Sequence, residues 1–193
     1  MIAGDAGAAP RLALDASRAS AAAMSVQQIY KGRIVDLRLE DVDLPGGRSV
    51  KLEVVHHPGA AAIVAVDDRD EVVVIRQLRH AAGGFIWEVP AGTLAPGEAP
   101  AACARRELRE EAGLVATDWT PLGSILTTPG FCDERIHLYL ARDLSAAAQQ
   151  LDHDEVLTVT RMPFAEALAM VHRGEIEDAK SIAALCRARE RIG

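Results

Sequence analysis

The chain has 193 residues, of which 49% are hydrophobic and 25% charged, and its formal net charge is −7. This length predicts one domain with a sizeable core. The negative charge argues against broad nucleic-acid binding, which needs a basic surface, and no apolar run is long enough to span a membrane. A nucleotide ligand stays open, because a metal ion can carry the phosphate contacts. The three cysteines are scattered without metal-ligand spacing, which predicts a reducing, cytoplasmic compartment.

The N-terminal part of the chain divides into a tail and a hairpin. Residues 1–25 are rich in alanine and of low complexity, and we expect a disordered tail without a secretory signal. Residues 30–39 and 49–56 each alternate apolar and polar side chains, and a Pro-Gly-Gly turn at 44–48 separates them. This pattern predicts a β-hairpin over residues 26–57.

The rest of the chain, residues 58–193, reads as one domain without an internal repeat or a dividing linker. Short apolar runs predict strands and amphipathic runs predict helices. We expect strands at 60–66, 71–75, 85–89, 120–126, 136–141 and 156–162, and helices at 163–172 and 178–191. A mixed β-sheet with one helix layer on each face would bury these elements, so the predicted fold class is α/β.

An acidic helix is the most informative stretch of the sequence. Pro100 suits a first helical position and Gly113 suits a C-terminal cap, which predicts a helix of about 12 residues between them. Helical spacing puts Glu107, Glu110 and Glu111 on one face. Such hard oxygen ligands suit Mg2+ or Mn2+. Because arginines are interleaved, a solvated acidic face is the alternative interpretation. The six histidines lack paired spacing, and we interpret them as structural or surface residues.

The surroundings of this helix resemble a known signature. Gly92 is followed after five residues by Glu98 and after seven more by the run Arg106-Glu-Leu-Arg-Glu-Glu-Ala-Gly-Leu114. This matches every fixed position of the Nudix box, the loop-helix-loop signature of Nudix hydrolases. Further segments resemble the ADP-ribose pyrophosphatase branch of that family across residues 26–190: RQLR at 76–79, WEVPAG at 87–92, PGFCDE at 129–134 and DAKS at 178–181.

The resemblance implies a fold, a reaction and a metal site. The fold would be the Nudix α/β/α sandwich with a mixed β-sheet, preceded by the N-terminal β-hairpin. The reaction would be metal-dependent hydrolysis of the pyrophosphate bond of ADP-ribose to AMP and ribose 5-phosphate. Glu107, Glu110 and Glu111, with the carbonyl of Ala91, would bind Mg2+, or Mn2+ in its place. In the family, a glutamate in the loop after Pro129 acts as the general base, which makes Glu134 the candidate here. The alternative is that Glu134 is a surface carboxylate without a catalytic role.

Other residues receive supporting or substrate-binding roles. Glu98 precedes the helix and could hold Arg106, which we expect to orient the carboxylates. Arg79 matches a substrate-binding arginine of the family, and its guanidinium suits phosphate. Glu88 matches a glutamate near the terminal ribose or the metals, and a buried partner for an arginine is the equal alternative.

The N-terminal hairpin often crosses to a second subunit in this family, so we expect a homodimer. Arg33 and Glu53 are the candidates for contacts to the adenine of the partner's substrate. The sequence departs from the family at Leu52, where an arginine is common, and it has no tryptophan in the hairpin. Base recognition is therefore open.

Two alternatives to ADP-ribose hydrolysis remain. One is a hydrolase of other NDP-sugars or dinucleoside polyphosphates. The other, from a different class, is a module that senses ADP-ribose without catalysis. A sensor that regulates transcription needs a DNA-binding appendage, for which the residues after Met162 are too few, and the intact carboxylates favour catalysis. We therefore expect a small-molecule substrate and no nucleic-acid or membrane partner.

Overall fold

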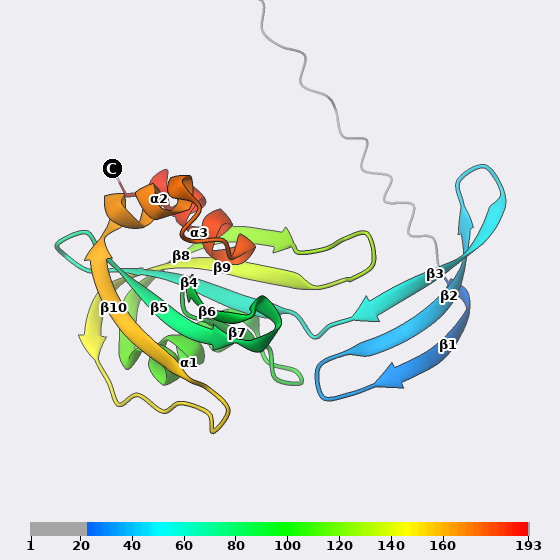
Figure 1. The fold of residues 1–193 in the computed structure, drawn as a ribbon, viewed down its shortest axis with the longest axis horizontal. Helices are drawn as coiled ribbons and strands as arrows, with labels where there is room; N and C mark the ends of the chain where they lie inside the picture. The colour runs from blue at the N-terminus through cyan, green and yellow to red at the C-terminus, as the bar shows by residue number, and fades with distance from the viewer. Residues whose placement is uncertain (1–22, 193) are drawn as a thin grey trace, which may run out of the picture.

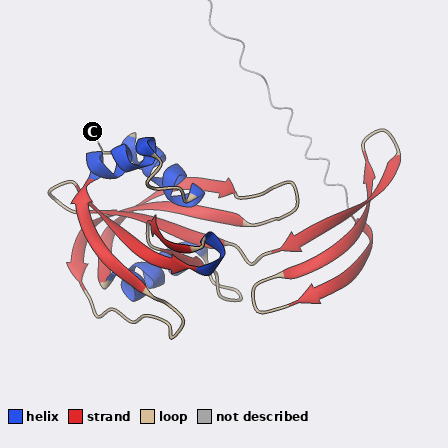
Figure 2. Ribbon diagram, in the orientation of Figure 1, coloured by secondary structure: helices blue, strands red, loops and turns tan. Residues whose placement is uncertain are grey.

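Two β-sheets make up the computed structural model, which describes residues 23–192 (Figure 1). The first is a three-stranded antiparallel sheet of β1 (Ala23–Lys31), β2 (Asp36–Leu44) and β3 (Arg48–His56). It projects from one end of the larger, seven-stranded sheet, which carries helices on both faces (Figure 2). Within the described residues, no helix is long and apolar enough to cross a membrane.

The small sheet confirms the predicted N-terminal antiparallel element and has three strands where two were expected. The expected strand over 30–39 is wrong, because the chain reverses after Lys31, where Gly32 N–H donates to Val35 O at 2.8 Å. The run Lys31-Gly32-Arg33 interrupts the apolar alternation at this turn, but a single glycine is a weak signal and the reversal was not predicted. The expected turn at 44–48 is present and joins β2 to β3. Of the predicted tail, residues 23–25 belong to β1, and residues 1–22 lie outside the described part of the chain.

The large sheet is mixed, as predicted. Its strand order is β10-β5-β4-β9-β8, with β6 paired to β5 and β7 paired to β4. Strands β4 and β9 run parallel, and the other pairs are antiparallel. The strands are β4 (Ala60–Val66), β5 (Glu71–Arg79), β6 (Gly84–Glu88), β7 (Ala91–Thr93), β8 (Leu114–Leu126), β9 (Arg135–Ala146) and β10 (Leu157–Pro163), with a 3₁₀ turn η1 (His80–Ala82) after β5.

Helices cover both faces of this sheet and complete the predicted α/β/α sandwich. Helix α1 (Pro100–Ala112) lies on one face, and α2 (Phe164–Arg173) and α3 (Ala179–Arg189) lie on the other (Figure 1). Central strand β4 is buried throughout, and its alternate residues serve the two cores. Ala61, Ile63 and Ala65 pack with α1, whereas Ala62, Val64 and Val66 pack with α2 and α3.

The predicted helix boundaries hold to within two residues, and three strands, β5, β8 and β9, are longer than predicted. Helix α1 begins with Pro100 at its N-terminus, and Gly113 ends it in the left-handed conformation, φ +64°. Strands β8 and β9 were expected at 120–126 and 136–141, yet they pair with each other from Leu114 to Leu126. The backbone groups of the two strands hydrogen-bond to each other even where the side chains are polar. The apolar pattern within one segment cannot reveal this pairing.

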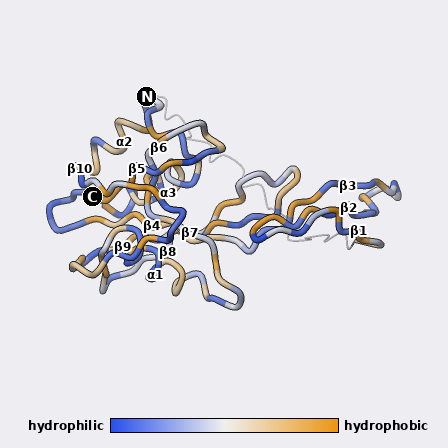
Figure 3. The backbone as a smooth tube through the Cα atoms, turned by 60° about the horizontal axis from the view of Figure 1, so that its bottom comes forward, coloured by the Kyte–Doolittle hydropathy of each residue, from blue (hydrophilic) through white to orange (hydrophobic). Residues whose placement is uncertain are grey.

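Hydrophobic side chains also occur outside the sandwich. Figure 3 shows hydrophobic segments within the strands of the small sheet as well as in the helices and strands of the large one. Several apolar residues of β1 and β3 are exposed: Met24, Val26, Ile29, Tyr30 and Leu52. The small sheet therefore has apolar surface that residues 23–192 leave exposed.

Candidate functional site

The acidic face of α1 is turned toward the sheet. Leu108 and Ala104 pack against β4, and this packing brings Glu107 and Glu111 inward, where they are only 7% and 1% exposed. Strand β7 lies next to both carboxylates. Ala91 N–H donates to Glu111 Oε2 at 2.8 Å. A Cβ atom at Gly92 would lie 1.9 Å from Glu107 Oε1, so only glycine leaves room for that carboxylate.

Burial makes these carboxylates unusual acids. It raises the pKa of Glu107 to about 7 and the pKa of Glu111 to about 8. The hydrogen bond from Ala91 N–H opposes the rise in the Glu111 pKa, and the negative charges of Glu107 and Glu155 add to it. Two close, buried carboxylates of this kind fit the donor chemistry of a hard divalent cation, which would stabilise their charged forms.

The structure does not arrange these carboxylates as a closed metal cage. No group of three histidine, cysteine, aspartate or glutamate side chains within residues 23–192 is placed to hold a metal ion. Glu107 and Glu110 instead share the guanidinium of Arg106, whose Nη1 donates to both, at 2.6 and 2.9 Å. The metal-ligand roles of Glu107, Glu110, Glu111 and the Ala91 carbonyl stay predictions.

Arg106 is the cation that organises the outer side of this cluster. Its Nε and Nη2 donate to the two oxygens of Glu98, each at 2.9 Å, and Nη2 also donates to Thr93 O at 3.1 Å. The bond to Arg106 holds the pKa of Glu98 down at about 2. The structure thus brings Glu98 and Arg106 together as a support for Glu107 and Glu110.

Arg79 and Glu88 form a second charged group beside the acidic helix. Arg79 Nε and Nη2 donate to the two oxygens of Glu88, at 2.9 and 2.8 Å. Lys180 Nζ donates to Glu88 Oε2 at 2.8 Å. Burial alone would raise the pKa of Glu88, which is 2% exposed, but the two cations outweigh burial and lower it. Glu88 has the contacts of a buried ion-pair partner, whereas the Arg79 side chain is 40% exposed.

The DAKS segment anchors this group, a role that the sequence analysis did not assign. Asp178 caps α3 by accepting from Ser181 N–H at 2.9 Å. Ser181 Oγ, which is buried, accepts a hydrogen bond from Val89 N–H at 2.8 Å, so α3 is fixed to the end of β6. The resemblance of this segment to the family was the signal that could have revealed the anchor.

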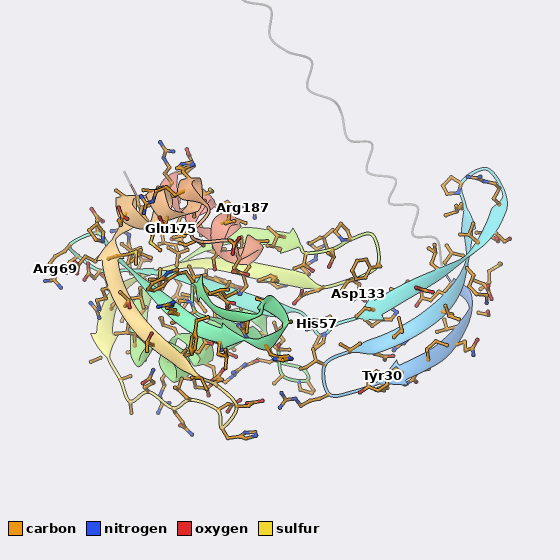
Figure 4. The ribbon with its side chains drawn as sticks, in the orientation of Figure 1. Tyr30, His57, Arg69, Asp133, Glu175 and Arg187 are labelled. Carbon is orange, nitrogen blue, oxygen red and sulfur yellow. The ribbon has the colours of Figure 1, made fainter. Side chains whose placement is uncertain are left out.

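Glu134 lies in a loop that is tied to the small sheet. Val55 N–H donates to Phe131 O at 2.7 Å and Asp133 N–H donates to Val55 O at 3.1 Å, so main-chain hydrogen bonds join this loop to β3. Glu134 Oε1 is 3.3 Å from His57 Nδ1. Figure 4 shows His57 and Asp133 near each other where β3 meets the large sheet. The role of Glu134 as base stays a prediction.

Glu155 is an acidic residue that the sequence analysis missed. It ends a loop that is bound to the C-terminal turn of α1, where Gln150 N–H donates to Glu110 O at 3.0 Å and Gln149 Nε2 donates to Glu111 O at 2.6 Å. The negative charge of Glu155 raises the pKa of Glu111 and of Glu107. No spacing in the sequence links this polar loop to α1, so only the fold reveals the proximity.

The two residues assigned to adenine belong to the small sheet and its first turn. Arg33 sits in the turn between β1 and β2 and pairs with Asp154, 3.2 Å away, at an exposed position. Glu53 lies exposed on β3, opposite Leu39 of β2. These positions do not test the prediction that Arg33 and Glu53 contact the adenine of a substrate bound to a second subunit.

His56 joins three parts of the chain. Its Nδ1 lies 2.6 Å from Asp133 Oδ2 and its Nε2 lies 2.7 Å from Glu40 Oε1. Burial alone would lower the pKa of His56, and Arg38 lowers it further, but the two carboxylates outweigh both and raise it. His56 therefore bridges β2 and the loop that carries Glu134, and a protonated imidazole can donate to both carboxylates.

This bridge predicts pH-dependent stability. Because the pKa of His56 is raised on folding, its contribution is complete below the unfolded pKa and is lost as the pH rises through the folded pKa. We expect His56→Gln to lower the free energy of unfolding by roughly 1 kcal/mol at pH 5.5 and by less at pH 8.5. Urea titrations at both values measure this, with His80→Gln, at an exposed position, as control. An equal loss at both pH values would contradict the bridge.

Comparisons with known proteins agree with this geometry. The family model for the NUDIX domain matches residues 55–185. The chain is 41% identical to an ADP-ribose pyrophosphatase of Bacillus subtilis, over 82% of this chain and 87% of that one. It is 44% identical to an ADP-ribose pyrophosphatase of Mycobacterium tuberculosis, over 83% and 79%, and 40% identical to a methanol dehydrogenase activator of Bacillus methanolicus, over 84% and 89%.

A solved structure supports the fold. The crystal structure of an ADP compounds hydrolase superposes with a TM-score of 0.77 at 24% identity, and the match covers 89% of this chain and 94% of that one. The family match spans most of the chain and includes the whole of α1 and the loops around it. The chain therefore belongs to the Nudix family and is a Nudix hydrolase.

Proposed function

We propose that this enzyme hydrolyses the pyrophosphate bond of ADP-ribose to AMP and ribose 5-phosphate, and that it needs Mg2+, with Mn2+ as an alternative ion. The observation that carries the proposal is the pair of buried carboxylates, Glu107 and Glu111, on a helix with the complete Nudix signature. The names of the relatives from Bacillus subtilis and Mycobacterium tuberculosis support this substrate.

The charges around the site suit a pyrophosphate. In this proposal Glu107, Glu110, Glu111 and the Ala91 carbonyl hold the divalent cation, which neutralises phosphate charge and acts as a Lewis acid. Arg106 fixes two of these carboxylates from the outside. Arg79 keeps part of its guanidinium exposed beside Glu88, and we assign it to a phosphate of the substrate.

The first test is a substrate panel. Purified protein is incubated with ADP-ribose, ADP-glucose, GDP-mannose, NADH and diadenosine polyphosphates, with Mg2+ or with chelator, and nucleotide products are followed. We expect preferred turnover of ADP-ribose to AMP that chelator abolishes. Comparable turnover of the other substrates would widen the specificity. Binding of ADP-ribose without turnover would instead favour the sensor.

Glu111 provides a matched test of the metal site. Because it is buried on the acidic face, Glu111→Gln should lower kcat by at least ~100-fold while the melting temperature stays near or above that of wild type. The control is Glu177→Gln, at an exposed position near α3, which should leave kcat unchanged. A near-normal rate for Glu111→Gln would remove this carboxylate from the metal site.

The general base can be identified by comparing two loops. The family resemblance assigns it to Glu134, whereas Glu155 is the loop carboxylate whose charge acts on both Glu107 and Glu111. We expect the Glu→Gln change at the base to lower kcat by about 100-fold or more with KM little changed, and the other change to have a small effect. Steady-state kinetics of both variants decide the assignment. Unchanged kcat for Glu134→Gln would end its candidacy.

We also propose that the enzyme is a cytoplasmic homodimer whose small sheets pack together. The exposed apolar side chains of β1 support a protein partner, and Val26 is 51% exposed. Arg33 and Glu53 would then reach the partner's substrate. The three cysteines are free, in keeping with a reducing compartment. The partners proposed are a small-molecule substrate and a second copy of the chain, with neither nucleic acid nor membrane.

Light scattering tests the dimer. Wild type should have twice the 20.6 kDa mass of one chain. Val26→Lys should shift the population toward monomer, because it places charge in the apolar face. Asp68→Lys, in the exposed turn between β4 and β5, is the control and should keep the wild-type mass. A monomeric wild type at assay concentrations would contradict the proposal.

A further inference from the structure

Gln77 in β5 has a buried side chain that the contacts described above do not explain. The residue is 3% exposed, and its side-chain oxygen Oε1 is buried without a hydrogen-bond partner. Across residues 23–192, every other buried side-chain nitrogen or oxygen atom has a partner. An unpaired buried acceptor destabilises a fold. Its presence near the end of β5 points to a hydrogen-bond donor that comes from outside the chain.

Gln77 lies on the face of the sheet that α1 covers. Side chains two residues apart on a strand share a face, so Ile75 and Arg79 are its neighbours there. Val73, further along the same face, packs in the buried cluster that includes Leu108 of α1. Gln77 therefore faces the same side of the sheet as the acidic helix.

The two strands beside β5 carry carboxylates toward this position. On one side Gln77 pairs with Ile86 of β6, and Glu88 lies two residues further along that strand. On the other side it pairs with Leu157 of β10, which Glu155 precedes by two residues. The bond from Leu78 N–H to Val156 O, 2.9 Å, extends the pairing toward Glu155.

The groups around Gln77 limit what can satisfy its oxygen. An amide oxygen accepts hydrogen bonds, and ionised carboxylates cannot donate them. Arg79 already donates through Nε and Nη2 to Glu88. A water molecule can give one hydrogen to the amide oxygen and the other to a carboxylate, which fixes the direction of its lone pairs. An amide does this without adding a charge to the acidic cluster.

We propose that Gln77 is a positioning residue that orients the attacking water, an inference that rests on the hydrolysis proposed above. Oε1 accepts one hydrogen of the water, and the second hydrogen faces a carboxylate on the same face of the sheet. The water oxygen forms a bond to a phosphorus of the pyrophosphate, and the bridging P–O bond breaks with its electron pair leaving on the departing phosphate. The proton of the water passes to the carboxylate.

The test replaces the amide by apolar side chains. Gln77→Met keeps the length of the side chain, and Gln77→Leu is a second variant in case one packs badly. We expect kcat for ADP-ribose to fall by about tenfold or more and KM to stay within about threefold, because the contact orients the water and does not bind the substrate. The melting temperature should equal or exceed that of wild type, because an unpaired polar group has been removed. Ile86→Val on the neighbouring strand is the control and should keep kcat.

The outcomes separate this inference from the proposed function. Unchanged kcat in both Gln77 variants would overturn the role of Gln77, and so would a raised KM with kcat retained, which indicates a contact to the substrate instead. A melting temperature well below that of wild type in both variants would show that the amide is a structural group. A wild type that does not hydrolyse ADP-ribose overturns the proposed function as well, whereas an active wild type with equally active variants overturns only the role of Gln77.

Discussion

The packing of α1 on β4 is the constraint on which the candidate site depends. Leu108 and Ala104 face the alanine-rich surface of β4, which lets the helix approach closely. The acidic face adjoins the apolar one on the same helix, so this approach also pushes Glu107 and Glu111 out of water. Gly92 leaves the space that the Glu107 carboxylate fills, because any side chain at this position would overlap with the carboxylate. Hydrophobic burial thus supplies the free energy that holds two carboxylates in an unfavourable place.

Charge neutralisation differs between the carboxylates of this region. Glu98 and Glu88 each have a bidentate arginine, and the pKa of each is lowered. Glu111 accepts a neutral N–H donor from Ala91, and its pKa is raised. Glu88, Glu98 and Glu107 are therefore each paired with an arginine, whereas Glu111 accepts from a neutral N–H and keeps capacity for a cation. This contrast singles out Glu111 as the buried acid that a bound cation would stabilise most directly.

Two loops that are far apart in the sequence are attached to different parts of the fold. The segment after β9 bonds to the last carbonyls of α1 and brings Glu155 beside it. The loop before β9 is attached instead to β3 through Phe131 and Asp133, so it follows the small sheet. In the proposed dimer, the partner would contact the small sheet. Main-chain hydrogen bonds would link that contact to the loop that carries Glu134.

The sequence by itself determined the family, the limits of α1 and the pairing of acidic side chains on one helical face. These features depend on local spacing: Pro100 and Gly113 bound the helix, and the 3.6-residue period aligns Glu107 with Glu111. The mixed sandwich followed from the succession of apolar runs, but the turn after Lys31 did not, because Gly32 alone is a weak turn signal between two apolar segments. Only the tertiary structure decided that Glu88 is shared by Arg79 and Lys180, that Glu155 lies beside α1, and that Gln77 is buried without a partner. The reason is that burial and partner choice arise from contacts between distant segments, which no spacing along one chain records.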